Sequence, residues 1–223
     1  MQLDSVQIGV TNLGEAARAY ELLLAVPPQP LPGGGRRFQL ARGAVELEGG
    51  ETGVHSIAFV ADADSALRSA AADAFHGIRV HVDADAPEAL PDAATAPAID
   101  HVVVRTAAPE RAIALWRERF GLRLALDREF PDRGLRLLFF RSGGITLEYA
   151  CAMAASQEDA HDDRFHGVSY RVPQLQQWHS RLIAAGVDVS EIRVGMRPGT
   201  SVCTVRSGTA GVPTLLLETP AAR

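Results

Sequence analysis

The sequence predicts an α+β fold built from tandem β-α-β-β-β modules, with the first of two domains truncated. Two observations support this fold class. A strand, a helix and several short strands follow one another in the same order within each half of the chain, and the second half repeats the first. The length of 223 residues and the hydrophobic content of 47% suffice for two small domains with buried cores. We expect residues 1–95 to form a degenerate domain and residues 96–223 a complete one.

The first half shows only part of the module pattern. A strand near Leu3–Val6 and a helix at Gly14–Leu24 are followed by strands and a second helix. These are predicted at Ala44–Glu48, His55–Val60, Ser65–Ala74 (the helix) and Ile78–Asp83. The stretch Ala84–Ala98 is rich in Ala, Pro and Asp and is typical of a linker. The first domain is therefore expected to lack one or two strands of its last module.

The second half contains two complete modules. The first is predicted to comprise strand Ile99–Val104, helix Pro109–Phe120 and strands Leu122–Leu126, Leu135–Phe140 and Ile145–Tyr149. The second is predicted to comprise strand Val168–Val172, helix Leu175–Ala185 and strands Ile192–Val194, Ser201–Val205 and Thr214–Glu218. Pro109 suits a first helical turn, and Gly121 and Gly186 suit helix ends.

The correspondence between the two halves is visible in individual residues. The opening Leu3-Asp4-Ser5-Val6 matches Ile99-Asp100-His101-Val102, and Tyr20 matches Trp116 within the two predicted helices. Ser5 thus stands in the first half where His101 stands in the second.

Composition and charge favour a small-molecule partner. The net charge of -5, with only 22 Lys and Arg, offers no basic stripe for a nucleic acid. No apolar run is long enough for a membrane span, and the N-terminus does not resemble a signal peptide, so we expect a cytoplasmic protein without a membrane partner. Cys151 and Cys203 lack a metal-binding spacing and are expected to be core thiols.

Four potential metal ligands lie in or beside the predicted strands of the second half: His101, Glu148, His166 and Glu218. Two imidazoles and two carboxylates can supply all the protein ligands of a divalent ion. Four protein ligands leave one or two positions of an octahedron open for a substrate. Strand side chains alternate, so Arg105 shares a face with His101, and Tyr170 shares one with His166. We expect Arg105 to bind an anion and Tyr170 to donate a hydrogen bond to a ligand or line the site.

The run Ile99–Arg105, followed by a helix that ends Trp116-Arg117-Glu118-Arg119-Phe120-Gly121-Leu122, resembles the vicinal oxygen chelate superfamily. This superfamily includes glyoxalase I, extradiol ring-cleavage dioxygenases, methylmalonyl-CoA epimerase and bleomycin and fosfomycin resistance proteins. The resemblance covers nearly the whole chain as a tandem pair and is fullest over residues 99–220. It implies curved sheets that enclose a metal, with His101, Glu148, His166 and Glu218 at the four ligand positions.

Three functions are consistent with this resemblance. The first is a glyoxalase-like isomerase or lyase that uses nickel, zinc or cobalt, in which Glu218 leaves the metal to act as a base. The second is an iron(II) extradiol dioxygenase that uses only His101, His166 and Glu218. The third is a metal-free protein that binds or sequesters a small molecule. Glu148 favours the first, because the dioxygenase triad does not need it.

Other polar segments are interpreted as structural. Gly33-Gly34-Gly35 lacks the context of a phosphate loop, and Ser156–Arg164 is expected to be a solvated loop. The first domain keeps Glu48 and His55 at two ligand positions but has Ser5 at a third, so we expect it to be catalytically silent. Exposed module edges make a homodimer an expectation as well.

Overall fold

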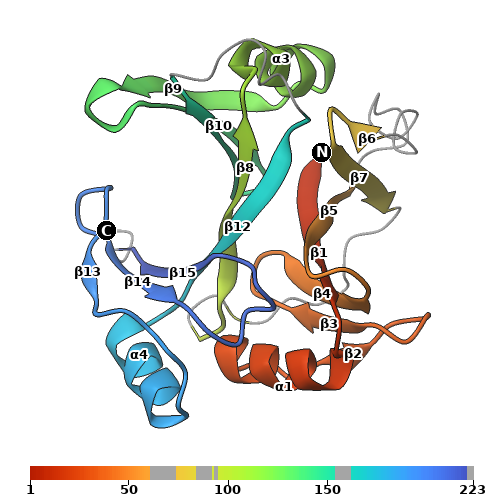
Figure 1. Ribbon diagram of the computed structural model, residues 1–223, viewed down its shortest axis with the longest axis vertical. Coiled ribbons are helices and arrows are strands. Elements are labelled where there is room, and N and C mark those ends of the chain that lie inside the picture. Colours follow the sequence, from red (N-terminus) through yellow and green to blue (C-terminus); the bar gives the residue numbers. More distant parts are fainter. Residues whose placement is uncertain (61–73, 84–91, 93–94, 154–161, 220–223) are drawn as a thin grey trace. The chain divides into compact units, whose positions relative to one another are not determined.

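The computed structural model describes residues 1–60, 74–83, 92, 95–153 and 162–219 (Figure 1). The first half of the chain forms β1 (Gln2–Val10), α1 (Leu13–Leu24), β2 (Gln29–Pro30), β3 (Arg36–Gln39), β4 (Ala44–Gly49), β5 (Gly53–Val60), β6 (Ala74–Phe75) and β7 (Ile78–Asp83). The second half forms β8 (Ala98–Thr106), α3 (Pro109–Ile113), the π-helix η1 (Ala114–Arg119), β9 (Arg123–Phe130), the 3-10 helix η2 (Pro131–Arg133), β10 (Leu135–Ser142), β11 (Ile145–Ala152), β12 (Arg164–Arg171), α4 (Leu175–Ala184), β13 (Arg193–Val194), β14 (Ser201–Val205) and β15 (Thr214–Glu218).

The strands form two mixed sheets, which confirms the predicted α+β class and the tandem β-α-β-β-β modules. Their orders are β2-β3-β4-β1-β5-β7-β6 and β13-β14-β15-β12-β8-β11-β10-β9. In each complete module the last strand pairs with the first. Thus β11 is parallel to β8, and β15 is parallel to β12. A parallel pair needs a crossover connection, and the helix of each module lies within that connection.

The module that begins at β5 is the reduced one. Its described residues form β5, β6 and β7, one strand fewer than each other module forms. The helix predicted from Ser65 lies outside the described residues up to residue 73, and so does most of the predicted linker Ala84–Ala98.

The chain divides into two compact units. Unit 1 comprises the described parts of Met1–Ser5, His55–Pro87 and His101–His166. Unit 2 comprises those of Val6–Val54, Glu88–Asp100 and Gly167–Arg223. Each unit therefore contains strands from both halves of the sequence.

The core of unit 1 is an aromatic cluster on one face of β8–β11. Trp116 and Tyr149 are completely buried, and the Trp116 indole Nε1 donates a 2.7 Å hydrogen bond to the Tyr149 hydroxyl. The ring of Phe59, from β5, lies 5.7 Å from that of Trp116, and Phe75, from β6, packs edge-on against Phe120 at 5.1 Å. Aromatic pairs in this range add to the free energy gained by burial.

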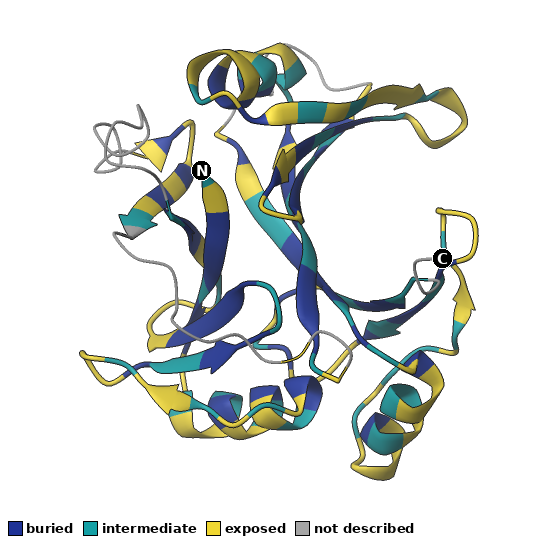
Figure 2. Ribbon diagram, turned by 180° about the vertical axis from the view of Figure 1, so that it is seen from behind, coloured by how far each residue is buried: buried dark blue, intermediate teal, exposed yellow. Residues whose placement is uncertain are grey.

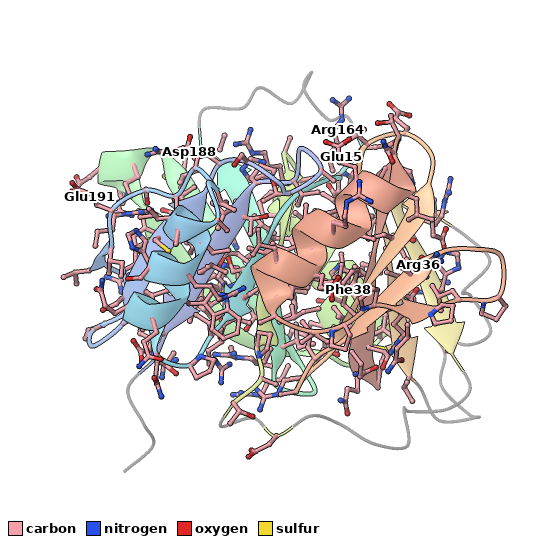
Figure 3. The ribbon with its side chains drawn as sticks, turned by 90° about the horizontal axis from the view of Figure 1, so that it is seen from below. Glu15, Arg36, Phe38, Arg164, Asp188 and Glu191 are labelled. Carbon is pink, nitrogen blue, oxygen red and sulfur yellow. The ribbon has the colours of Figure 1, made fainter. Side chains whose placement is uncertain are left out.

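The core of unit 2 lies against α1. Asn12 caps the start of this helix by accepting a hydrogen bond from the Glu15 amide, and Tyr20 packs against Phe38 of β3 with ring centroids 6.1 Å apart. Figure 3 shows Phe38 beside α1, while Glu15 and Glu191 lie towards the outside of the unit.

The helix predicted at Pro109–Phe120 forms as two unlike pieces. Pro109 occupies the first helical turn, as predicted, but from Ala114 the backbone widens into a π-helix. The Phe120 amide donates to the carbonyl of Leu115, five residues back. The spacing of apolar residues over a six-residue segment does not distinguish a π-helix from an α-helix.

Both cysteines are buried free thiols, as predicted. Among the described helices, none is long and apolar enough to span a membrane.

Candidate functional site

His101 and Glu148 are brought together by the parallel pairing of β8 and β11. His101 pairs with Thr146 and Val103 pairs with Glu148, so both side chains point to the same face one row apart. His101 Nε2 lies 3.8 Å from Glu148 Oε2, and each side chain is 18% exposed. This separation is longer than a direct hydrogen bond, and it leaves the two groups able to act on the same atom of a bound molecule.

Arg105 and His166 form the second contact of the predicted site. The Arg105 Nη2 atom lies 3.2 Å from His166 Nε2. A guanidinium can only donate, so Nε2 of a neutral imidazole accepts this hydrogen bond and the proton of the ring is on Nδ1. Burial and then the positive charge of Arg105 lower the pKa of His166. His166, one of the predicted metal ligands, thus has its Nε2 atom engaged by an arginine.

Glu218 lies in unit 2 and binds the start of α4. Its Oε2 atom accepts a 3.3 Å hydrogen bond from the backbone amide of Leu175, the first residue of that helix. Gln174, at the N-cap, makes no side-chain capping bond, so the Glu218 carboxylate satisfies an amide that the cap leaves open.

Tyr170 is completely buried in unit 2. Its hydroxyl has no hydrogen-bond partner among the described residues. Burial, together with the nearby Tyr20, raises its pKa. This placement gives no support to the predicted contact with a substrate.

His101, Glu148 and Arg105 belong to one face of the β8–β11 part of the sheet, which we call the His101 face. The strand registers place twelve residues on it: His101, Val103 and Arg105 of β8; Thr146, Glu148 and Ala150 of β11; Leu137, Phe139 and Arg141 of β10; and Arg123, Leu126 and Arg128 of β9. The aromatic core lies on the opposite face. Figure 1 shows β9 and β10 curving away from β8, and Figure 2 shows the far end of their hairpin as exposed.

The His101 face is basic and partly apolar. Arg105, Arg123, Arg128 and Arg141 are exposed, and Val103, Leu126 and Phe139 are half-buried. Glu148 is the only acid among the twelve residues. No expectation for Arg123, Arg128 or Arg141 follows from the sequence alone. Their shared face depends on the strand register and on the irregularity opposite Phe139 and Phe140, which an alternating pattern alone does not locate.

The described residues do not fit the predicted four-ligand metal centre. In the part of the chain that the structure describes, no group of three or more His, Cys, Asp or Glu side chains is arranged to hold a metal ion. His101 and Glu148 fit as a pair. His166 Nε2 accepts from Arg105, and the Glu218 carboxylate accepts from the α4 backbone.

Ser5, Glu48 and His55 stand in the first half at positions that correspond to predicted ligands of the second. Ser5 is buried, and its hydroxyl has no hydrogen-bond partner among the described residues, while Glu48 and His55 are exposed. That the first domain is silent stays a prediction.

Comparison with known proteins gives the family. Residues 100–204 match the model of the Glyoxalase/Bleomycin resistance protein/Dioxygenase superfamily. The second half of the chain belongs to this superfamily. The matched residues include His101, Glu148 and His166 but not Glu218. No curated protein matches the sequence.

Solved structures with a similar fold extend the comparison, and one of them covers the whole chain. A mutant of 4-hydroxymandelate synthase from Streptomyces coelicolor superposes with a TM-score of 0.74 over 100% of this chain and 93% of its own, at 15% identity. Methylmalonyl-CoA epimerase from Mycobacterium tuberculosis has a TM-score of 0.47 over 59% of this chain and 93% of its own, at 18% identity. The first of these supports the same fold for both halves of the chain.

Proposed function

We propose that the His101 face binds a small anionic molecule, with Arg105 holding its carboxylate and the His101–Glu148 pair contacting its adjacent oxygens. The observation that supports this proposal most directly is the contact between the exposed Arg105 guanidinium and His166 Nε2 at 3.2 Å. The neutral imidazole fixes the guanidinium without cancelling its charge, so a full positive charge remains available for a carboxylate.

The spacing along β8 limits the size of the ligand. Arg105 and His101 are four residues apart, about 13 Å between their Cα atoms at the usual rise of a strand. Glu148 pairs with Val103, which lies between them. A molecule bound over Val103 therefore has Arg105 at one end, His101 at the other and the Glu148 carboxylate beside it.

This arrangement suits proton transfer as well as binding. A carboxylate beside a bound carbon acid is a general base when it lies within hydrogen-bond reach of the proton, and His101 is placed to exchange a proton with the same ligand. Arg105 fixes the orientation of the ligand in this scheme.

The binding proposal is tested with malonate and pyruvate as probes, by isothermal titration calorimetry. The Arg105→Gln variant is expected to bind both about 10- to 150-fold more weakly, because a charge-assisted hydrogen bond contributes roughly 1.5–3 kcal/mol. Arg117→Gln, which removes an exposed arginine from η1, is the control and is expected to bind as the unchanged protein does. Equal binding by Arg105→Gln and the unchanged protein overturns the proposal.

A second candidate is the metal-dependent isomerase or lyase of glyoxalase type. The 3.8 Å approach of His101 and Glu148 favours it, since an imidazole and a carboxylate at this distance suit a shared divalent ion. Nickel, zinc or cobalt would supply Lewis-acid activation of the ligand's oxygens there. Two ligands hold such an ion weakly, so this candidate requires further ligands that the described side chains do not bring together.

The metal candidate has its own measurement. If this candidate is right, mass spectrometric metal analysis of protein purified without chelator shows near-stoichiometric nickel, zinc or cobalt, and Glu148→Gln loses most of it. If the purified protein contains no metal and does not bind added metal, this candidate is contradicted, but the binding proposal is not. Iron that survives in Glu148→Gln instead indicates the dioxygenase triad of His101, His166 and Glu218, which no contact in the described residues favours.

A further inference from the structure

Arg123 and Arg141 form an uncompensated pair of positive charges on the His101 face. They are direct cross-strand partners on β9 and β10, and both are exposed. Like charges directly opposite one another destabilise a sheet. In the described part of the chain neither arginine makes an ion pair.

The neighbouring acids of this hairpin are directed elsewhere. Asp127 pairs with Leu138 and therefore faces the opposite side of the sheet, where both of its oxygens accept hydrogen bonds from Arg136 at 2.8 Å. Arg136 also binds Glu110 at 2.6 Å. The hairpin thus pairs Asp127 with an arginine on one face, while Arg123 and Arg141 on the other face make no ion pair among the described residues.

The arginine pair is aligned with the proposed binding site. Arg141 Nη1 donates a 2.6 Å hydrogen bond to the hydroxyl of Thr146, which is only 4% exposed. Thr146 in turn pairs with His101, so Arg123, Arg141, Thr146 and His101 form one row across four strands. With strands about 4.8 Å apart, the backbone of Arg141 lies about 10 Å from that of His101.

The residues beside this row are apolar. Phe139 and Leu126 are paired and half-buried, and Phe139 is also paired with Glu148. A ligand that reaches from Glu148 to the arginine pair crosses these two side chains.

We propose that Arg123 and Arg141 bind the phosphate of a phosphate monoester, and that the ligand of the His101 face carries this phosphate on an apolar body. The inference rests on the proposed function for the His101 end of the ligand, and on the arginine pair for the phosphate end. A monoester dianion matches two guanidinium charges, and each planar guanidinium can donate two parallel hydrogen bonds to its oxygens. The Arg141–Thr146 contact holds one guanidinium in place before the ligand arrives.

Phenyl phosphate is the probe, since it carries a phosphate dianion on an apolar ring, and inorganic phosphate tests the anion alone. Calorimetry is expected to show phenyl phosphate binding about tenfold more weakly to Arg123→Gln and to Arg141→Gln. Arg117→Gln is expected to bind it as the unchanged protein does. Thermal unfolding provides a second readout. Without phosphate, Arg123→Gln is expected to melt above the unchanged protein because the charge repulsion is gone. Phosphate is expected to raise the melting temperature of the unchanged protein and of Arg117→Gln by more than that of Arg123→Gln.

The inference is overturned if the unchanged protein binds neither phosphate probe, if binding survives in both hairpin variants, or if Arg117→Gln loses it to the same extent. Its failure is distinguishable from that of the proposed function. If malonate binds through Arg105 but phenyl phosphate does not bind, only the phosphate subsite is refuted. If phenyl phosphate binds but malonate does not, only the proposed role of Arg105 is refuted.

Discussion

At the scale of single residues, the contact between Arg105 and His166 fixes which ring nitrogen of His166 carries the proton. An imidazole that accepts from a guanidinium is neutral, and its pKa is lowered first by burial and then by the arginine's charge. Because the unfolded chain binds a proton more readily than the folded one, this group reduces stability as the pH falls below about 6.5, the usual value for histidine. Above that pH it has no effect on stability.

Replacement of Arg105 is predicted to raise the pKa of His166 without restoring it fully. In Arg105→Gln the nearby charge is lost, while burial, the larger cause, remains. The pKa is measured by NMR titration of the imidazole C–H resonances, which are assigned with His166→Ala. Arg117→Gln is the control. An unchanged or lower pKa in Arg105→Gln contradicts the geometry described here.

The predicted site residues show what a sequence pattern can and cannot establish. The identity and strand positions of His101 and Glu148 are enough to bring them together, since first and last strands of a module pair in parallel. The hydrogen bond from the Leu175 amide to Glu218 cannot be predicted from the sequence, because it depends on how the chain turns before α4. Arg105, the partner of His166, is itself a predicted site residue. Strand alternation, however, relates residues within one strand and does not relate Arg105 to a residue on β12.

At the scale of secondary-structure elements, most strands and helices follow directly from the alternation and periodicity of apolar residues. Ser201–Val205 and Thr214–Glu218 form the predicted strands with the same bounds, whereas the wider π-turn of η1 required packing information. The close approach of β12 to the segment before β15 was also not predictable. Gly167 lies so near Pro213 that an added Cβ would be 2.4 Å from the Pro213 carbonyl oxygen.

Substitution of Gly167 is therefore predicted to destabilise the protein. Gly167→Ala must push β12 from the backbone of Pro213, to which the Val168 amide is hydrogen bonded at 3.0 Å. We expect a loss of about 1–3 kcal/mol in the free energy of unfolding, as for overpacked cores. Gly49→Ala, at a glycine where an added Cβ would have no neighbouring atom within 4 Å, is the matched control in the same urea titration. Equal midpoints for the two variants would refute this explanation.

Two helices of unit 2 share one capping arrangement. The last turn of α1 contains no basic residue, and its exposed carbonyls are bound by α4. Arg181 donates to the carbonyls of Leu22 and Leu23, and the Trp178 indole donates to Leu23 at 2.8 Å. A positive charge at a helix C-terminus is favourable, and each bond satisfies a carbonyl that the helix leaves open.

Loss of this arrangement is predicted to cost about 1–2 kcal/mol of unfolding free energy. Arg181→Met keeps a long side chain but removes the donors and the charge. The control is Arg206→Met, because Arg206 forms an exposed ion pair with Asp188 at 3.3 Å, and such pairs contribute little. Chemical denaturation of both variants checks the prediction, which is wrong if Arg206→Met proves the more damaging change.

At the scale of the whole molecule, the repeated modules are recognisable in the sequence, but the compact units are not. The halves at residues 1–95 and 96–223 describe the repeat, whereas unit 1 combines β5–β7 of the first half with β9–β11 and most of β8 from the second. Packing of Phe59 on Trp116 and of Phe75 on Phe120 crosses that boundary. Neither contact follows from periodicity, which indicates only that these residues are buried.

A fragment of residues 96–223 is consequently predicted to be less stable than the intact chain. Without Phe59 and Phe75, the completely buried Trp116 gains access to water. In a Trp178→Phe background, where Trp116 is the only tryptophan left, its fluorescence is expected to shift to longer wavelength in the fragment. Urea unfolding should occur at a lower concentration in the fragment than in the intact Trp178→Phe chain. Identical spectra and midpoints would show that residues 96–223 are self-sufficient.

Each compact unit contains strands from both halves of the chain, and this also affects how folding depends on protein concentration. Strands that must meet across the two halves are tethered by one polypeptide, so their encounter is intramolecular and has an effective concentration set by the connecting chain. If the two halves were separate polypeptides, the same contacts would form by association, and the fraction folded would fall as the solution was diluted. Covalent fusion of the repeats therefore makes the integrity of unit 1, and of the His101 face within it, independent of how much protein is present.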